Sequence, residues 1–191
     1  AVKNLEKNPE KASSRLGLAQ KSVEQMRNIV AKLLNYSRSS DHERRVISLG
    51  EIATDSLQLI DQSFQMEGVE LILAPGGEEC LVEANAGEIQ QVLLNLLVNA
   101  RLALTGQAQG KVRVSLGPGR IQVDDNGPGI SPENLQRVFE PFFTTRELGQ
   151  GVGLGLSISR EIATSHGGDL SYRPSELGGA CFVVTLPGVE E

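Results

Sequence analysis

The stretch that most constrains this chain is residues 123–130, with the sequence VDDNGPGI. It follows a run of strand-like alternation, and Gly127, Pro128 and Gly129 cannot continue that strand. The chain must therefore turn here and leave the carboxylate of Asp125 at a strand end, beside exposed backbone N–H groups. This combination suits a nucleotide, although Asp-Asn-Gly-Pro-Gly is also ordinary turn chemistry.

Composition limits the classes of protein that the chain can belong to. With 191 residues, 39% of them hydrophobic and 22% charged, it can build one well-cored domain and an appendage. It has no apolar run long enough to cross a bilayer. A net charge of −6 without a basic stripe argues against nucleic-acid partners and against contact with anionic membranes.

The two cysteines, Cys80 and Cys181, lie far apart in apolar segments and form no Cys-x-x-Cys pair. They are expected to be reduced core residues of a cytoplasmic protein rather than a disulfide or a metal site. The chain opens with Ala1 and carries no signal peptide. We therefore expect it to be a fragment of a longer protein.

Apolar residues near the N-terminus follow a helical repeat. They alternate in steps of three and four at Leu16, Ala19, Val23, Met26, Val30 and Leu33. Such a seam needs a partner, so it predicts either one helix of a bundle or an amphipathic helix packed on its own domain. We expect this helix within residues 1–40, a linker over 41–47 and one domain over 48–191.

The remaining pattern predicts an α+β domain. Helical periodicity predicts helices over residues 49–64, 86–104 and 154–165, the first of them capped by Ser48. Period-two alternation predicts strands over residues 69–73, 80–83, 111–116, 120–124, 169–173 and 180–186. Helices that cover one face of a mixed, mostly antiparallel sheet give a two-layer α/β sandwich.

Two asparagines and a group of glycines carry candidate chemistry. Asn95 and Asn99 lie four apart on a predicted helix, so their amides point the same way, either to backbone partners or to Mg²⁺. The glycines of residues 151–155 lead into another predicted helix, whose N-terminal amides attract phosphate. Leu156 stands where a Walker A loop needs Lys, and the glycine spacing differs from the dinucleotide-binding pattern.

Four blocks occur in order along the chain, at residues 91–100, 123–130, 139–146 and 151–159. They resemble the N, G1, F and G2 boxes of the catalytic ATP-binding domain of two-component sensor histidine kinases, in the GHKL or Bergerat ATPase superfamily. One glycine cluster is a weak signal, but four ordered matches are a strong one. The resemblance extends over residues 13–187. It implies a Bergerat-type fold preceded by a long bundle helix, the second helix of the dimerisation and histidine-phosphotransfer module.

The resemblance also implies a role for each matched residue. Asp125 accepts from the exocyclic amine of adenine, Asn99 holds Mg²⁺, Asn95 supports it, and Arg146 is a candidate for stabilising charge during the reaction. The implied ATP-binding set is Asn95, Asn99, Asp125, Gly127, Gly129, Ile130, Thr144, Thr145, Arg146, Gly151, Val152, Gly153, Leu154, Gly155 and Leu156.

Asn95 also bears on the reaction. Gyrase- and heat-shock-90-type ATPases carry a glutamate near this position, and an amide cannot accept the proton that such a glutamate takes from water. Hydrolysis should therefore be slow, which leaves the γ-phosphate for a histidine and for relay to an aspartate of a response regulator. The full-length protein is expected to form a homodimer through the helix bundle.

The family's phospho-accepting motif is absent from this sequence. His42 is interpreted as a linker residue, and His166 as the end of a helix before a glycine cap. The resemblance thus implies a protein histidine kinase that cannot phosphorylate itself as this chain.

Some positions depart from the family pattern. Val152 stands where a small hydroxyl residue is common, Ala180 where Thr is common, and Leu102 where a polar residue is common. The phenylalanines of residues 139–143 are expected to anchor a lid over the triphosphate by packing. Two other classes stay open, namely a regulatory, pseudokinase-like nucleotide-binding module and a gyrase-like or Hsp90-like ATPase.

Overall fold

The computed structural model describes residues 43–76, 80–146 and 152–189. The helix predicted within residues 1–40 lies outside the described residues. Every element described below belongs to one compact unit, formed by residues 42–143 and 153–191. Within the described ranges, no helix has the length and apolar character needed to cross a membrane.

Five strands of this unit form its main sheet, in the order β2-β4-β5-β7-β6. Their bounds are β2 Glu70–Leu73, β4 Lys111–Gly117, β5 Arg120–Asp125, β6 Asp169–Pro174 and β7 Ala180–Thr185. β2 runs parallel to β4, and the other neighbours are antiparallel. β4 and β5 form a hairpin at Gly119, where φ is +59° and a Cβ would lie 2.2 Å from the carbonyl oxygen of Leu186. Only glycine fits that turn.

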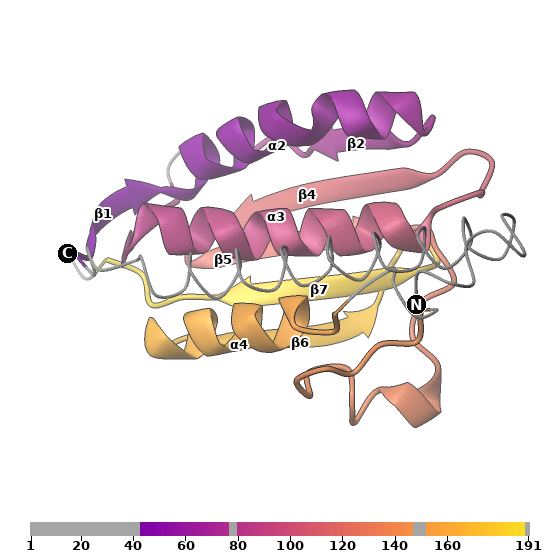
Figure 1. Cartoon of the computed structure of the whole chain (residues 1–191). Coiled ribbons are helices and arrows are strands. Elements are labelled where there is room, and N and C mark those ends of the chain that lie inside the picture. The colour runs from indigo at the N-terminus through magenta and orange to yellow at the C-terminus, as the bar shows by residue number, and fades with distance from the viewer. Residues whose placement is uncertain (1–42, 77–79, 147–151, 190–191) are drawn as a thin grey trace, which may run out of the picture. The chain divides into compact units, whose positions relative to one another are not determined.

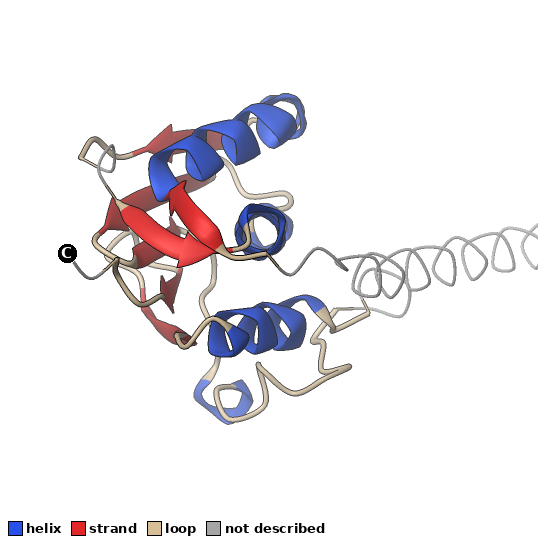
Figure 2. Ribbon diagram, turned by 90° about the vertical axis from the view of Figure 1, so that its left-hand side faces the viewer, coloured by secondary structure: helices blue, strands red, loops and turns tan. Residues whose placement is uncertain are grey.

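Three helices cover one face of the sheet (Figures 1 and 2). They are α2 Leu49–Met66, α3 Ala86–Ala103 and α4 Gly155–Ser165. The Oγ of Ser48 accepts from the Glu51 N–H at the start of α2, and Asn85 caps α3 through the Glu88 N–H. These caps supply acceptors that the first turn of a helix lacks, and they set where each helix begins.

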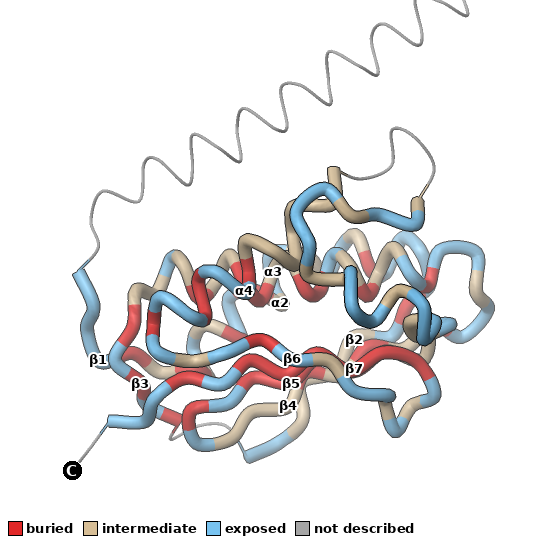
Figure 3. The backbone as a smooth tube through the Cα atoms, turned by 90° about the horizontal axis from the view of Figure 1, so that it is seen from below, coloured by how far each residue is buried: buried red, intermediate tan, exposed pale blue. Residues whose placement is uncertain are grey.

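The core lies between the helices and the sheet (Figure 3). Alternate residues of the strands point toward it, including Val112, Val114, Ile121 and Val123. The buried stripe of α3 comprises Ile89, Val92, Leu93, Leu96, Leu97 and Ala100. Because the apolar periods of helix and strand both face this layer, burial holds the two layers together.

The predicted fold class is confirmed, and most predicted element bounds lie within two residues of the observed ones. The N-terminal edge of the domain differs from the prediction. β1, Arg45–Ser48, pairs antiparallel with β3, Leu81–Ala84, in a separate two-stranded sheet. The last residues of the predicted linker over 41–47 thus form a strand. Val46 and Ile47 are too short an apolar pair to predict a strand, and the pairing with β3 decides its conformation.

The packing of α3 makes a direct prediction about stability. Leu93 is fully buried, so Leu93→Ala should lower the free energy of unfolding by about 2 to 5 kcal/mol, through lost burial and the cavity left behind. Leu59 on α2 is 67% exposed, and Leu59→Ala should change it by less than about 0.5 kcal/mol. Urea denaturation of both variants measures the difference, and equal losses would contradict this account of the core.

Candidate nucleotide-binding site

Asp125 lies at the end of β5 and is only 3% exposed. Its Oδ1 accepts two backbone hydrogen bonds, from the N–H of Gly127 at 2.8 Å and from the N–H of Ala180 at 3.1 Å. No described residue donates to its Oδ2. The side chain is therefore held by one oxygen, which leaves the other as an acceptor for a ligand.

The environment of Asp125 disfavours the ionised form of its carboxyl group. Burial raises the pKa of its carboxyl above the ordinary value, and the nearby charge of Asp124 raises it further. The backbone N–H groups of Ala180 and Gly127 act in the opposite direction. A buried acceptor with a raised pKa is typical of a functional site.

Asn126 fixes the strand end that carries this carboxylate. Its Oδ1 accepts from the Lys111 N–H at 2.7 Å, and its Nδ2 donates to the carbonyl oxygen of Gln109 at 3.0 Å. Gln107 in turn donates to the Asn126 carbonyl at 2.9 Å. In the sequence Asn126 was interpreted only as a turn residue, whereas here its side chain ties β5 to the start of β4.

Gly179 is a site residue that the sequence interpretation missed. A Cβ at Gly179 would lie 2.2 Å from Asp125 Oδ1 and 2.4 Å from the backbone nitrogen of Gly127. Only a glycine allows the chain before β7 to approach the carboxylate so closely. The signal available was the Gly178-Gly179 pair, which reads equally well as a simple turn.

Gly127 and Gly129 line the same turn. A Cβ at Gly127 would lie 3.5 Å from the side chains of Ala103 and Leu104, at the end of α3. Gly129 has φ of +70° and lies against Gly179. The turn therefore packs on both α3 and the approach to β7, as a pocket wall must.

Asn95 and Asn99 both lie beside the start of α4, so the two amides are on the same side of α3, as their spacing predicts. A Cβ at Gly155 would lie 3.7 Å from Asn99 Nδ2 and 3.9 Å from Asn95 Cγ. The Nδ2 of Asn95 donates to the Oγ of Ser159 at 3.3 Å, and Ser159 is fully buried. Ser159, another residue that the sequence did not single out, thus fixes the orientation of the Asn95 amide.

The first turn of α4 is left open to an anion. No side chain of the described residues caps it, in contrast to α2 and α3. Leu154, Gly155 and Leu156 are half-buried there, and Leu156 packs against the core, as does Ile130 after the glycine turn. Uncapped N–H groups at a helix start are donors available to phosphate.

Gly153 joins this turn to the preceding phenylalanine segment. It has φ of +70°, and a Cβ would lie 2.5 Å from the carbonyl oxygen of Phe143. Phe139 packs edge-on against Phe182, with 6.4 Å between ring centroids. Phe142 is 70% exposed, so the expectation that it anchors by packing is wrong for this residue. Its backbone, not its ring, contacts Gly153.

The remaining predicted residues lie outside the compact unit that carries these groups. Thr144, Thr145, Arg146 and Val152 belong to a different compact unit from the domain. Within that unit the Arg146 N–H donates to the Oγ1 of Thr144 at 3.2 Å. Gly151 lies outside the described residues. Their roles stay predictions.

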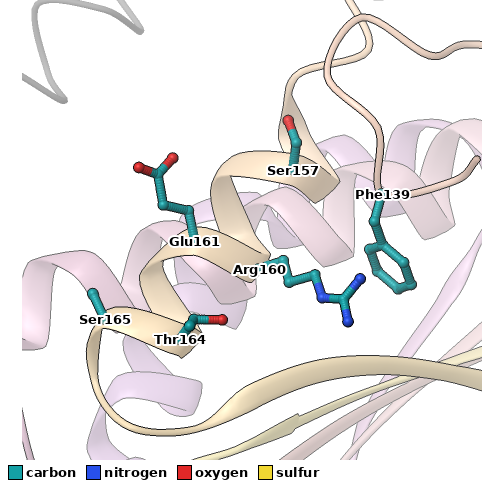
Figure 4. Close-up of a pocket in the computed structure, with 6 residues that line it drawn as sticks. All are labelled: Phe139, Ser157, Arg160, Glu161, Thr164 and Ser165. Atoms are coloured by element: carbon teal, nitrogen blue, oxygen red, sulfur yellow. The ribbon is translucent and has the colours of Figure 1, made fainter.

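A hollow of about 460 Å³ lies on the outer side of α4 and is a separate feature (Figure 4). Its wall includes Arg160, whose guanidinium carbon lies 4.9 Å from the ring centroid of Phe139. The Nε of Arg160 also forms an ion pair with Asp169 Oδ1 at 3.2 Å. None of the predicted ATP-binding residues lines this hollow.

His166 closes α4 as predicted, followed by Gly167 at φ of +78°. The ring is buried: its Nε2 accepts from the Asn85 N–H at 3.1 Å, and its Nδ1 lies 2.9 Å from the carbonyl oxygen of Ile162. This histidine joins α4 to the start of α3 and is unsuited to accept a phosphoryl group. His42 lies outside the described residues. Both cysteines are buried and free, as predicted.

The chain matches the family model for histidine kinase-, DNA gyrase B-, and HSP90-like ATPases over residues 84–190. Sensor histidine kinase ZraS of Klebsiella oxytoca is 32% identical over 170 residues, which cover 87% of this chain and 36% of that protein. Sensor protein FixL of Bradyrhizobium diazoefficiens is 33% identical over 191 residues, covering 96% and 37%. The chain thus spans little more than a third of these relatives.

Solved structures agree with these relatives. The catalytic domain of histidine kinase ThkA covers 78% of this chain and 99% of its own, with 30% identity and a TM-score of 0.67. A ThkA chain in complex with response regulator protein TrrA covers 95% of this chain and 53% of its own, with 26% identity and a TM-score of 0.72. The chain belongs to the histidine kinase-, DNA gyrase B- and HSP90-like ATPase family, as the ATP-binding domain of a two-component sensor kinase.

The close approach of Gly179 gives one prediction. Gly179→Ala should abolish measurable ATP binding, because the new methyl group displaces either the carboxylate of Asp125 or the backbone of Gly127. Gly117→Ala is the matched control, since a Cβ there meets nothing within 4 Å. Isothermal titration calorimetry with ATP compares the two variants. Unchanged affinity in Gly179→Ala would contradict the pocket described here.

The raised pKa of Asp125 gives a second prediction for this site. Such a carboxyl stabilises the fold below its unfolded-state pKa and loses that contribution as pH rises through its folded-state pKa, so at neutral pH the charge disfavours folding. Asp125→Asn should therefore unfold at no lower urea concentration than the wild type at pH 7. It should nevertheless weaken ATP binding by about 10- to 100-fold, the effect of losing a hydrogen bond to a charged group. A parallel loss of stability would argue for a purely structural role.

Proposed function

We propose that this domain binds ATP with Mg²⁺ and holds the γ-phosphate for transfer to a histidine on another segment. The observation that carries the proposal is the placement of three groups along α3. The turn at Gly127 contacts the end of the helix at Ala103, and the uncapped start of α4 faces Asn95 and Asn99. At 1.5 Å per residue these points lie roughly 6 to 12 Å apart along the helix. When the adenine base binds at the Gly127 turn, the triphosphate of the same ATP molecule reaches the start of α4.

The base end recognises adenine through Asp125. Its Oδ2 accepts from the exocyclic amine, and the fixed Oδ1 keeps the carboxylate from rotating. Guanine presents a carbonyl at that position, which a carboxylate repels. Ile130 supplies apolar lining beside the turn. Selectivity for adenine thus comes from a single buried acceptor.

The phosphate end combines neutral donors with a metal ligand. The N–H groups at the start of α4 would face the phosphates, and Asn99 would supply an amide oxygen to Mg²⁺, an ion that takes few protein ligands. The bound Mg-ATP supplies the phosphoryl group and neutralises part of its charge. Thr144, Thr145 and Arg146 add further contacts in this proposal, with Arg146 stabilising charge.

Transfer is favoured over hydrolysis because, among the described residues, α3 presents the amides of Asn95 and Asn99, and not a base, to the start of α4. The amide of Asn95 donates to Ser159, and an amide cannot take a proton from water. Water in the site is therefore not activated, and the γ-phosphate persists until a better nucleophile arrives. This property separates the proposal from a gyrase-like or Hsp90-like ATPase.

The nucleophile and the downstream partner lie outside the domain. The proposal places residues 1–40 in the second helix of a dimerisation bundle, with the acceptor histidine on a preceding helix and this part of the protein in the cytoplasm. A response regulator receives the phosphoryl group. The likeness to ThkA, which was solved in complex with a response regulator, supports this partner class.

The experiment that tests transfer uses the whole 191-residue chain. It is mixed with radiolabelled Mg-ATP and with a separate helical hairpin that bears an acceptor histidine beside an acidic residue. Acid-labile label should appear on the hairpin and not on the chain alone. Tight ATP binding without transfer would instead indicate a regulatory module, and sustained phosphate release without hairpin would indicate an ATPase.

The metal role gives a further prediction. Asn99→Ala should remove most of the gain in ATP affinity that Mg²⁺ confers, because the metal loses its protein ligand, while affinity in EDTA changes little. Gln90→Ala on the same helix is the control. Calorimetry with and without Mg²⁺ measures both, and an Asn99→Ala variant with the wild-type response to Mg²⁺ would contradict the assignment.

A further inference from the structure

Asp124, the neighbour of Asp125, is a fully buried carboxylate on the other side of the sheet. Successive residues of a strand point to opposite faces, so Asp124 lies on the face opposite to α2, α3 and α4. It stands in a cross-strand row with Arg113 on β4 and with Cys181 and Arg173 on β7 and β6. A buried charge on this face requires specific partners.

Those partners are well defined. Gln122 Nε2 donates to Asp124 Oδ2 at 2.6 Å, and Ser175 Oγ donates to Oδ1 at 2.9 Å. Arg113 Nη2 lies 3.7 Å from Oδ2 and 3.3 Å from a carboxylate oxygen of Glu176. Ser175 and Glu176 belong to the loop between β6 and β7, so Asp124 holds that loop against the sheet.

The same loop leads to the base-recognition carboxylate. Its Ser175 N–H donates to the carbonyl oxygen of Gly179 at 2.9 Å, and the Gly179 N–H donates to the carbonyl oxygen of Asp125 at 3.1 Å. The next residue, Ala180, donates its N–H to Asp125 Oδ1. One of the two bonds that fix the Asp125 side chain is thus supplied by the end of this loop.

We propose that Asp124 and Ser175 form a latch that positions the Gly179–Ala180 segment and, through it, the carboxylate that binds adenine. Asp124 and Ser175 are positioning residues, since neither touches the pocket. The inference rests on the proposed function. Its physical basis is that the hydrogen bonds within the loop converge on Ser175, whose Oγ accepts from the Leu177 N–H at 3.0 Å and whose carbonyl oxygen accepts from the Gly178 N–H at 3.0 Å. The hydrogen bond from Ser175 to the buried charge of Asp124 then ties this hydrogen-bonded loop to the sheet.

Ser175→Ala tests the latch, because it removes the hydroxyl and leaves both aspartates in place. ATP affinity, measured by calorimetry at pH 7, should fall about three- to tenfold, since part of the strength of one charge-assisted hydrogen bond is transmitted to the pocket. Ser175→Thr retains a hydroxyl and should restore the wild-type affinity. Ser171→Ala is the control, because Ser171 lies on the adjoining strand β6, with its Oγ directed to the carbonyl of Val183 and not to Asp124.

A second readout separates positioning from general stability. Amide hydrogen exchange at Ala180 should become faster in Ser175→Ala, while exchange at Val184, farther along β7, should not change. Uniform acceleration along β7, or a variant with wild-type ATP affinity, would overturn the latch. Wild-type protein that binds no ATP would overturn the proposed function as well, whereas wild-type binding with an unaffected Ser175→Ala variant would overturn the latch alone.

Discussion

The interaction on which the site depends is the pair of backbone N–H groups that hold one oxygen of Asp125. These groups come from Gly127 and Ala180, which are distant in the sequence and meet because β5 and β7 are neighbours in the sheet. The bonds fix the carboxylate in a buried position where its charge is unfavourable, and they leave the second oxygen for a ligand. The strand order, the tight approach of Gly179 and the turn after β5 all serve this one geometry.

α3 sets the distance between the two ends of the site. Its buried stripe packs on the sheet, while its polar positions remain on the side toward α4. The turn after β5 meets the end of this helix, and the start of α4 meets its middle. Asn95 and Asn99 can hold a metal and orient phosphates, but neither can act as a base. In the proposed function, the chemistry of the domain is therefore placement and charge neutralisation, as phosphoryl transfer requires.

Much of the fold and of the candidate site was predictable from local sequence, and the features that were missed have a common cause. The spacing of apolar residues predicted nearly every helix and strand, because burial imposes that spacing. Backbone sterics dictate the glycine turn after β5. β1, Gly179, Ser159 and the Asp124 network were missed. Each depends on a partner far away in the chain, and neither spacing nor residue type records that partner. The prediction that Phe142 anchors by packing was wrong for the same reason. Its backbone makes the contact at Gly153, while its ring is exposed.

The central claim is that adenine and phosphate occupy opposite ends of the pocket along α3. It is tested most directly by titrating the nitrogen-15-labelled chain with Mg-ATP and following backbone amide chemical shifts. The account predicts that the largest changes fall on Gly127 and Ala180 at one end and on Gly155 at the other. Shifts confined to the outer side of α4, around Arg160, or no shifts at all, would contradict it.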